Sequence, residues 1–149
     1  MRFEGSLVIK APMQKVWDFI MNVEQLAGCI PGCESIEIVD EKTFKSQITS
    51  KVAFLSVKLN STTNITEVDA PNKLSAITMG KDNLVRTSVN IKSGFKLDAL
   101  SEKETKLSDW CDVSIIGKLA TFGESTIRGK GKKVLKEFEQ MLKDRIEVN

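Results

Sequence analysis

The hydropathy pattern of the chain changes period near residue 117, and this change limits the folds that are open to it. From residue 34 to about 116, apolar and polar residues alternate, which is typical of strands with one buried face. After Gly117 apolar residues recur every three to four positions, which indicates one helix of about 30 residues. A block of strands followed by a long helix predicts an α+β protein with an antiparallel sheet.

The first 33 residues add one strand and two short helices to this plan. Residues 2–10 alternate as a strand does, and helical spacing follows from Pro12. A second short helix is expected around residues 23–29, where Pro31 and Gly32 end it. The expected order is therefore strand, two short helices, a run of hairpins and one long C-terminal helix.

The composition sets the broad class of protein and removes several kinds of partner. With 149 residues, 41% hydrophobic and 28% charged, the chain has the size of one globular domain, which we expect over residues 1–149. It has no transmembrane segment or export signal by sequence, so a cytoplasmic protein is expected. The net charge of +2 is scattered, which gives no case for a nucleic-acid partner.

Two local clusters have both a structural and a functional interpretation. The basic residues within 128–133 precede an amphipathic helix that contains Glu137 and Glu139, so a solvated helix face is favoured over an anionic partner site. Cys29 and Cys33 are four residues apart, but a closed zinc site needs four ligands and the chain has no His. No metal or cofactor is expected, and a redox role for these thiols stays open.

The inward phase of the long strands carries small hydroxyl residues among medium aliphatic ones. A solid core would favour larger groups, and a buried hydroxyl is costly unless it is hydrogen-bonded. A lined pocket that holds water or a ligand would account for the pattern, and hydrogen bonding within the sheet is the alternative. The hydroxyl residues concerned are Ser46, Ser50, Ser61, Thr63, Thr87 and Ser93.

Three glycines interrupt the first half of the expected long helix. Gly123, Gly129 and Gly131 each weaken a helix by up to about 1 kcal/mol relative to Ala. A close approach by a strand or a ligand would explain them. The continuous apolar stripe over residues 134–142 is expected to anchor the helix to the sheet.

Short motifs along nearly the whole chain resemble those of the CoxG family of carbon monoxide dehydrogenase subunits. The most specific is Leu-Ala-Gly-Cys-Ile-Pro-Gly-Cys-Glu at residues 26–34. Phe-Glu-Gly at residues 3–5, Glu-Val-Asp-Ala-Pro at 67–71 and Gly-Lys-Leu-Ala at 117–120 support it. This family lies within the START-like, helix-grip superfamily of hydrophobic ligand binders.

The resemblance implies a curved seven-stranded sheet that grips the final helix, with a tunnel whose mouth lies near the two short helices. Leu26, Ile30 and Pro31 would edge the entrance, while Leu119 and Phe122 would form part of the floor. Inward residues of the long strands would complete the ligand site, namely Ile48, Leu59, Val89, Ile91 and Phe95.

The resemblance also implies a function, because family members are associated with molybdenum-containing carbon monoxide dehydrogenases as accessory proteins. We therefore expect a non-catalytic carrier of a hydrophobic or amphipathic small molecule, such as a quinone or lipid, beside a molybdenum hydroxylase. An assembly subunit without a ligand is an alternative. An enzyme is disfavoured, because the chain has no His or Tyr and Asp109 is the one carboxylate placed on an inward strand phase.

Two departures from the family pattern concern membrane contact. Many members continue into a membrane-anchoring tail, whereas this chain stops at Asn149, so attachment by that route is not expected. Phe54 and Leu55 occupy a hairpin where the family often has a Gly-Pro type of turn. They either form an exposed contact patch for a membrane surface or a partner, or belong to a tip folded back onto the domain.

Overall fold

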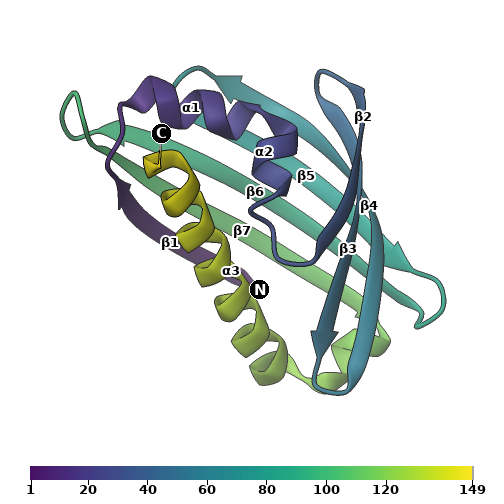
Figure 1. Cartoon of the computed structure of the whole chain (residues 1–149). Helices are drawn as coiled ribbons and strands as arrows, with labels where there is room; N and C mark the ends of the chain where they lie inside the picture. The colour runs from purple at the N-terminus through teal and green to yellow at the C-terminus, as the bar shows by residue number, and fades with distance from the viewer. Residues whose placement is uncertain (149) are drawn as a thin grey trace.

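The computed structural model describes residues 1–148, so Asn149, the last residue of the expected domain, lies outside the described residues. The elements follow the predicted order (Figure 1). They are β1 (Arg2–Ile9), α1 (Met13–Met21), α2 (Val23–Ala27), β2 (Cys33–Asp40), β3 (Thr43–Val52), β4 (Leu55–Asp69), β5 (Lys73–Asp82), β6 (Thr87–Ala99), β7 (Thr105–Gly117), the 3-10 helix η1 (Lys118–Phe122) and α3 (Glu124–Glu147).

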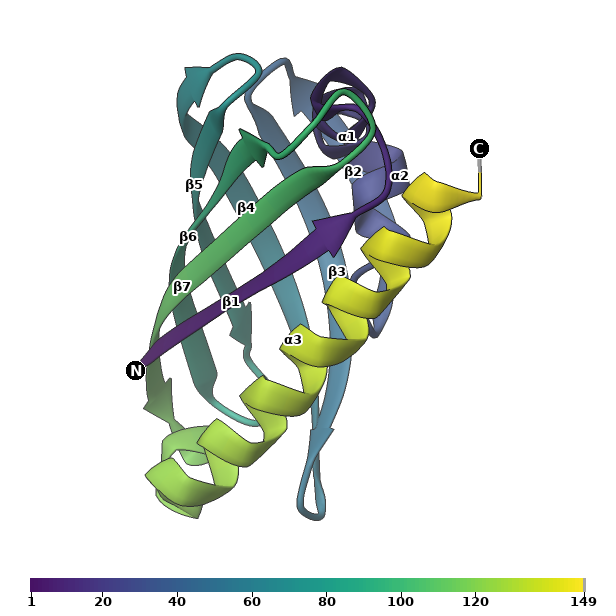
Figure 2. The same ribbon diagram turned by 90° about the vertical axis from the view of Figure 1, so that its left-hand side faces the viewer.

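The strands form one antiparallel sheet of seven in the order β1-β7-β6-β5-β4-β3-β2. Consecutive strands from β2 to β7 are neighbours, while β1 pairs with β7, the last strand in the chain. The sheet curves around α3, which lies across its concave side, and α1 and α2 cover one end (Figures 1 and 2). The predicted α+β helix-grip architecture is therefore confirmed.

The final helix begins later than the sequence pattern predicted. Gly117 and Gly123 have φ of +101° and +91°, in the left-handed region that favours glycine. The chain turns at both glycines, so η1 is a separate element and α3 starts at Glu124, with 24 residues instead of about 30. Neither α3 nor any other helix within residues 1–148 is both long enough and apolar enough to cross a membrane.

Two separate clusters of buried side chains hold the fold together. The larger lies where α1 and the C-terminal part of α3 meet the sheet. The buried residues of α3 are Leu142 and Ile146, whereas Val134 is half-exposed, so the anchor is nearer to the C-terminus than predicted. The smaller cluster joins η1 to the β3–β4 hairpin through Val52, Leu55, Val57 and Leu119.

Side chains of α3 fasten the helix to the free edge of β1. A guanidinium nitrogen of Arg128 donates to the carbonyl oxygen of Arg2 at 3.3 Å, and Nζ of Lys143 donates to the carbonyl oxygen of Val8 at 3.0 Å. An unpaired strand edge exposes backbone groups that can pair with another chain. The helix therefore satisfies this edge near both ends of β1.

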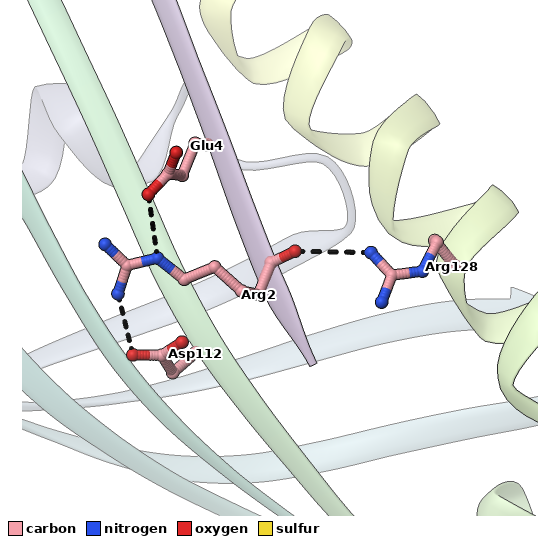
Figure 3. A network of polar contacts seen from close by, with 4 residues as sticks. All are labelled: Arg2, Glu4, Asp112 and Arg128. Carbon is pink, nitrogen blue, oxygen red and sulfur yellow. Dashed lines mark hydrogen bonds and ion pairs between the residues drawn. The ribbon is translucent and has the colours of Figure 1, made fainter.

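Arg2 also ties the start of β1 to β7. Its guanidinium donates to Oδ2 of Asp112 at 2.8 Å and to Oε1 of Glu4 at 3.1 Å (Figure 3). The same group lies 4.6 Å from the ring centroid of Trp110. These side chains are largely solvated, so water screens the ion pairs, and the network orients the strand more than it stabilises the fold.

Gly131 allows α3 to approach β1 closely. A Cβ at position 131 would overlap the buried ring of Phe3, whereas a Cβ at Gly129 would meet no atom within 4 Å. The guanidinium of Arg128 lies 5.6 Å from the centroid of the same Phe3 ring. The predicted close approach by a strand is therefore confirmed for Gly131, while Gly129 faces open space.

The two helix glycines should respond in opposite directions to alanine. Gly129→Ala should raise the free energy of unfolding by up to about 1 kcal/mol, because alanine favours the helix and nothing obstructs its methyl group. Gly131→Ala should lower it by about 1 kcal/mol, because the methyl group displaces the Phe3 ring. Urea denaturation measures both changes, and equal gains would contradict the tight contact with Phe3.

Candidate ligand-binding site

Between the two cores, the concave face of the sheet carries side chains that remain half-exposed. The strand register places Ile91 beside Val113, and Ser93 beside Cys111, while Ile48 lies on β3 at the other side of the sheet. We call these five residues the central band. All five are half-exposed and none belongs to either buried core, although they share the face on which α3 lies. The helix crosses in front of the band without covering it.

Four of the predicted strand contacts lie on this face. Ile48 and Ile91 belong to the central band, and Leu59 pairs with Ile48 at the border of the smaller core. Phe95 borders the larger core, where its ring stacks on Phe138 of α3 with the centroids 6.1 Å apart. The structure therefore brings these residues to the side of the sheet that faces α3.

The other predicted contacts at the smaller core are already packed against protein. Val89 and Leu119 are buried, and the half-buried Phe122 meets Phe54 edge to face with ring centroids 5.2 Å apart. Thr87 fixes η1 here, because its Oγ1 accepts from the amide of Leu119 at 3.1 Å. This end offers less accessible apolar surface than the central band, and the floor role of Leu119 and Phe122 stays a prediction.

The predicted entrance residues lie where α2 leads into β2. Leu26, Ile30 and Pro31 are all half-buried, and Leu26 packs against the larger core. Gly32 has φ of +82°, and its carbonyl oxygen accepts from the amide of Thr49 at 2.9 Å, which ties this connection to β3. Their role as an entrance stays a prediction.

The hydroxyl residues on the inward face divide into two kinds. Thr63 and Thr78 share a hydrogen bond of 2.8 Å between their Oγ1 atoms, and Oγ1 of Thr87 donates to the carbonyl oxygen of Val85 at 3.3 Å. Hydrogen bonding inside the fold, the alternative interpretation of the pattern, is thus correct for the threonines. Three serines instead remain half-exposed, namely Ser46, Ser50 and Ser93.

Two open hollows lie outside the space between α3 and the concave face. One of about 550 Å³ covers β2, β3 and β4 around Gln47 and Asn60, whose side chains form a hydrogen bond of 3.1 Å. The other, of about 530 Å³, follows the seam between β1 and α3 from Arg2 to Glu139. Neither hollow corresponds to the predicted tunnel, and the accessible apolar surface that faces α3 is the central band.

A buried pair of carboxyl groups lies where α3 meets β1 and β7. Asp109 is 6% exposed, and both of its oxygens and Oε2 of Glu139 are buried. Gly5 makes room for them, because a Cβ there would overlap both carboxyl groups. None of these three oxygens has a well-formed hydrogen bond within residues 1–148. A proton held between the two groups is the means by which they are satisfied.

Burial is the main cause of a large shift in the acidity of Asp109. Burial first, and then its contact with Glu139, raises the pKa of Asp109 from 3.8 to about 8. Asp109 is therefore protonated at neutral pH. Because its oxygens are covered, a substrate would reach them only if α3 moved, so the pair is not poised for acid–base chemistry on a bound molecule.

The partner in this pair was missed by the sequence interpretation. Asp109 lies on the inward phase as predicted, but Glu139, assigned there to a solvated helix face, is half-buried. Glu139 lies four residues after Leu135 and three before Leu142, so its position on the apolar stripe was the available signal. The direction of its side chain depends on the space left by Gly5, far away in the sequence.

The thiols form no metal centre in the described structure. Burial raises the pKa of Cys29 and of Cys33, so both stay protonated at neutral pH. Within residues 1–148, no three side chains of the metal-binding types are grouped closely enough to hold an ion.

The curved sheet, the long helix across it and the half-exposed apolar band define a START-like, helix-grip protein. Solved structures share this fold. A conserved protein from Geobacillus kaustophilus has a TM-score of 0.89 at 23% identity, over 98% of this chain and 95% of that chain. A START superfamily protein from Mycobacterium smegmatis has a TM-score of 0.74 at 12% identity, over 98% of this chain and 97% of that chain.

An enzyme has the same fold. The Zhui aromatase/cyclase from Streptomyces sp. R1128 has a TM-score of 0.75 at 13% identity, over 99% of this chain and 93% of that chain. Identities this low show a common fold alone.

The family of the chain follows from its sequence. The model of CoxG, a family of carbon monoxide dehydrogenase subunits, matches residues 5–147, so the chain belongs to this family. The match includes the segment 26–34 on which the resemblance chiefly rested. Comparison with curated protein sequences gave no significant match.

The acid pair predicts how stability depends on pH. Between pH 4 and 8, folded Asp109 keeps its proton while the unfolded side chain loses it, so the free energy of unfolding should fall as pH rises, by at most about 1.4 kcal/mol per pH unit. Asp109→Asn should remove this slope and raise the melting temperature at pH 7 more than at pH 4. Thermal unfolding across this range tests it, with Asp98→Asn, an exposed carboxylate on β6, as the control. An unchanged slope in Asp109→Asn would contradict the shared proton.

Proposed function

We propose that this protein is a non-catalytic carrier that holds a hydrophobic or amphipathic small molecule between the central band and α3. The observation that carries the proposal is the half-exposure of the central band on an inner face between two packed cores. Removing apolar surface from water stabilises a complex by about 25 cal/mol per Å². A ligand that covers the band would supply this stabilisation, which protein packing leaves unused.

The remaining predicted contacts would complete the site around the ligand. We assign the entrance to the α2–β2 connection, and the floor to η1 beside the smaller core. The half-exposed hydroxyl of Ser93 is available to orient a polar group of the ligand. The proposed ligand contacts are Leu26, Ile30, Pro31, Ile48, Leu59, Val89, Ile91, Phe95, Leu119 and Phe122.

Membership of the CoxG family supports an accessory role beside a redox enzyme. We place the protein with a carbon monoxide dehydrogenase-like molybdenum hydroxylase, with a quinone or a lipid as the ligand that it carries. The cytoplasmic location remains a prediction. The partner enzyme belongs to this proposal and follows from the family alone.

Catalysis is the weaker proposal for this site. The aromatase/cyclase neighbour shares the fold at 13% identity, which transfers no activity to this chain. The chain has neither His nor Tyr, and the carboxyl group with a raised pKa, Asp109, is sealed beneath α3. An assembly subunit without a ligand is the remaining alternative, and ligand binding distinguishes it from a carrier.

A bulky residue in the central band should block binding without unfolding the protein. Ser93→Phe places a ring in the half-exposed band, and we expect about tenfold weaker binding of the fluorescent apolar probe anilinonaphthalene sulfonate. Ser88→Phe, at an exposed position on the same strand, is the matched control. Fluorescence titration gives the affinities, and native mass spectrometry of the wild type identifies any co-purified molecule. A wild type that neither retains a molecule nor binds the probe would favour the assembly subunit.

A further inference from the structure

Large apolar side chains are exposed at the end of the molecule that carries η1. Leu84 in the β5–β6 turn is 95% exposed, Phe54 in the β3–β4 turn is 80% exposed, and Ile116 near the end of β7 is 73% exposed. The β3–β4 turn, η1 and the β5–β6 turn lie at the end of the sheet opposite α1 (Figure 1). We call the segments 51–58, 81–88 and 114–124 the η1 tip.

Contacts among these segments hold the η1 tip together. The ring of Phe54 meets Phe122 of η1 edge to face at 5.2 Å, and the amide of Lys118 donates to the carbonyl oxygen of Arg86 at 3.1 Å. Beneath them, Leu119 packs in the smaller core with Leu55. Leu55 is therefore buried, and Phe54 alone of that predicted pair is on the surface. The exposed side chains stand on a packed base.

The carboxylate of Asp82 shapes the turn that presents Leu84. Its Oδ1 accepts from the amide of Leu84 at 2.9 Å, and its Oδ2 accepts from the amide of Lys58 at 2.8 Å. These amides lower the pKa of Asp82 and satisfy its charge inside the turn. Leu84 is consequently held outward by a structured turn that joins β5 to β6 and reaches β4.

The charged residues of the η1 tip are mostly basic. Its three segments contain five basic side chains, at Lys51, Lys58, Lys81, Arg86 and Lys118, against two acidic ones. Of the two, Asp82 is engaged by backbone amides, and Glu124 accepts from the guanidinium of Arg128 at 2.9 Å. The tip therefore presents apolar side chains with a surplus of positive charge around them.

We propose that the η1 tip docks on the surface of a lipid bilayer that contains anionic lipids. Aromatic and aliphatic side chains enter the interface between headgroups and acyl chains, while lysine and arginine are attracted to anionic headgroups. The apolar residues stand on separate turns of a projecting end, which suits a fluid surface better than one complementary groove. This inference rests on the proposed carrier function, because an apolar cargo that leaves the protein requires an apolar phase to receive it.

Vesicle flotation tests the docking surface directly. Wild-type protein should float with vesicles of phosphatidylcholine and phosphatidylglycerol, and less with phosphatidylcholine alone or at high salt, because salt screens the basic side chains. The double variant Phe54→Asp, Leu84→Asp should lower the bound fraction roughly tenfold. Met79→Asp, at a 61% exposed position on β5 outside the tip, is the matched control and should bind as the wild type does.

The outcomes separate the docking surface from the carrier function. Binding of anilinonaphthalene sulfonate is measured on the same samples and should be equal in the wild type and the double variant. A wild type that binds the probe but floats with neither vesicle overturns the membrane surface and leaves a protein partner as the occupant of the tip. A wild type that floats through its tip but binds no probe upholds docking and overturns the carrier. Equal flotation of the double variant and the wild type also overturns the proposal.

Discussion

The seam between β1 and α3 is the contact on which the rest of the structure depends. The helix lies along a strand edge whose carbonyl oxygens accept from Arg128 and Lys143, and Gly131 brings the helix down to the ring of Phe3. Because α3 is held along this edge and buried at its C-terminal end by Leu142 and Ile146, it spans the concave face without filling it. The half-exposed central band is thus a consequence of how the helix is fastened, since a helix seated in the middle of the sheet would cover these side chains.

The buried carboxyl groups at this seam show that packing there is not arranged for greatest stability. An apolar pair of similar volume would avoid the cost of desolvating two acids, and such replacements in other proteins are often neutral or stabilising. Here Gly5, Asp109 and Glu139 come from three elements that meet at one point, so the pair fixes how the helix registers on β1 and β7. Its stability comes with a proton, and this couples the grip of the helix to the acidity of the surroundings.

The features that follow from local periodicity could be predicted from the sequence, and those that depend on distant residues could not. The strand block, the short helices and the inward position of Asp109 follow from alternation, and the segment 26–34 pointed to the family. The start of α3 was wrong because a glycine in a helical pattern does not reveal its own φ, and Gly123 takes a left-handed value. Glu139 was wrong because its surroundings are set by Gly5 on β1. At the β3–β4 turn, adjacent positions proved opposite in burial, since Leu55 turns into the smaller core and Phe54 does not.

The pairing of β1 with β7 also governs the order in which the chain can fold. β1 leaves the ribosome first, yet its partner strand and the helix that covers its edge come last, so the sheet lacks one complete edge until synthesis is nearly over. Hairpins β2 to β7 join neighbours in the chain and can form as they emerge, whereas the β1–β7 contacts span almost the entire chain and bear the largest loop-closure entropy. The nascent protein therefore waits with the edge of β7 open, a state that invites strand exchange with a second nascent chain until β1 returns.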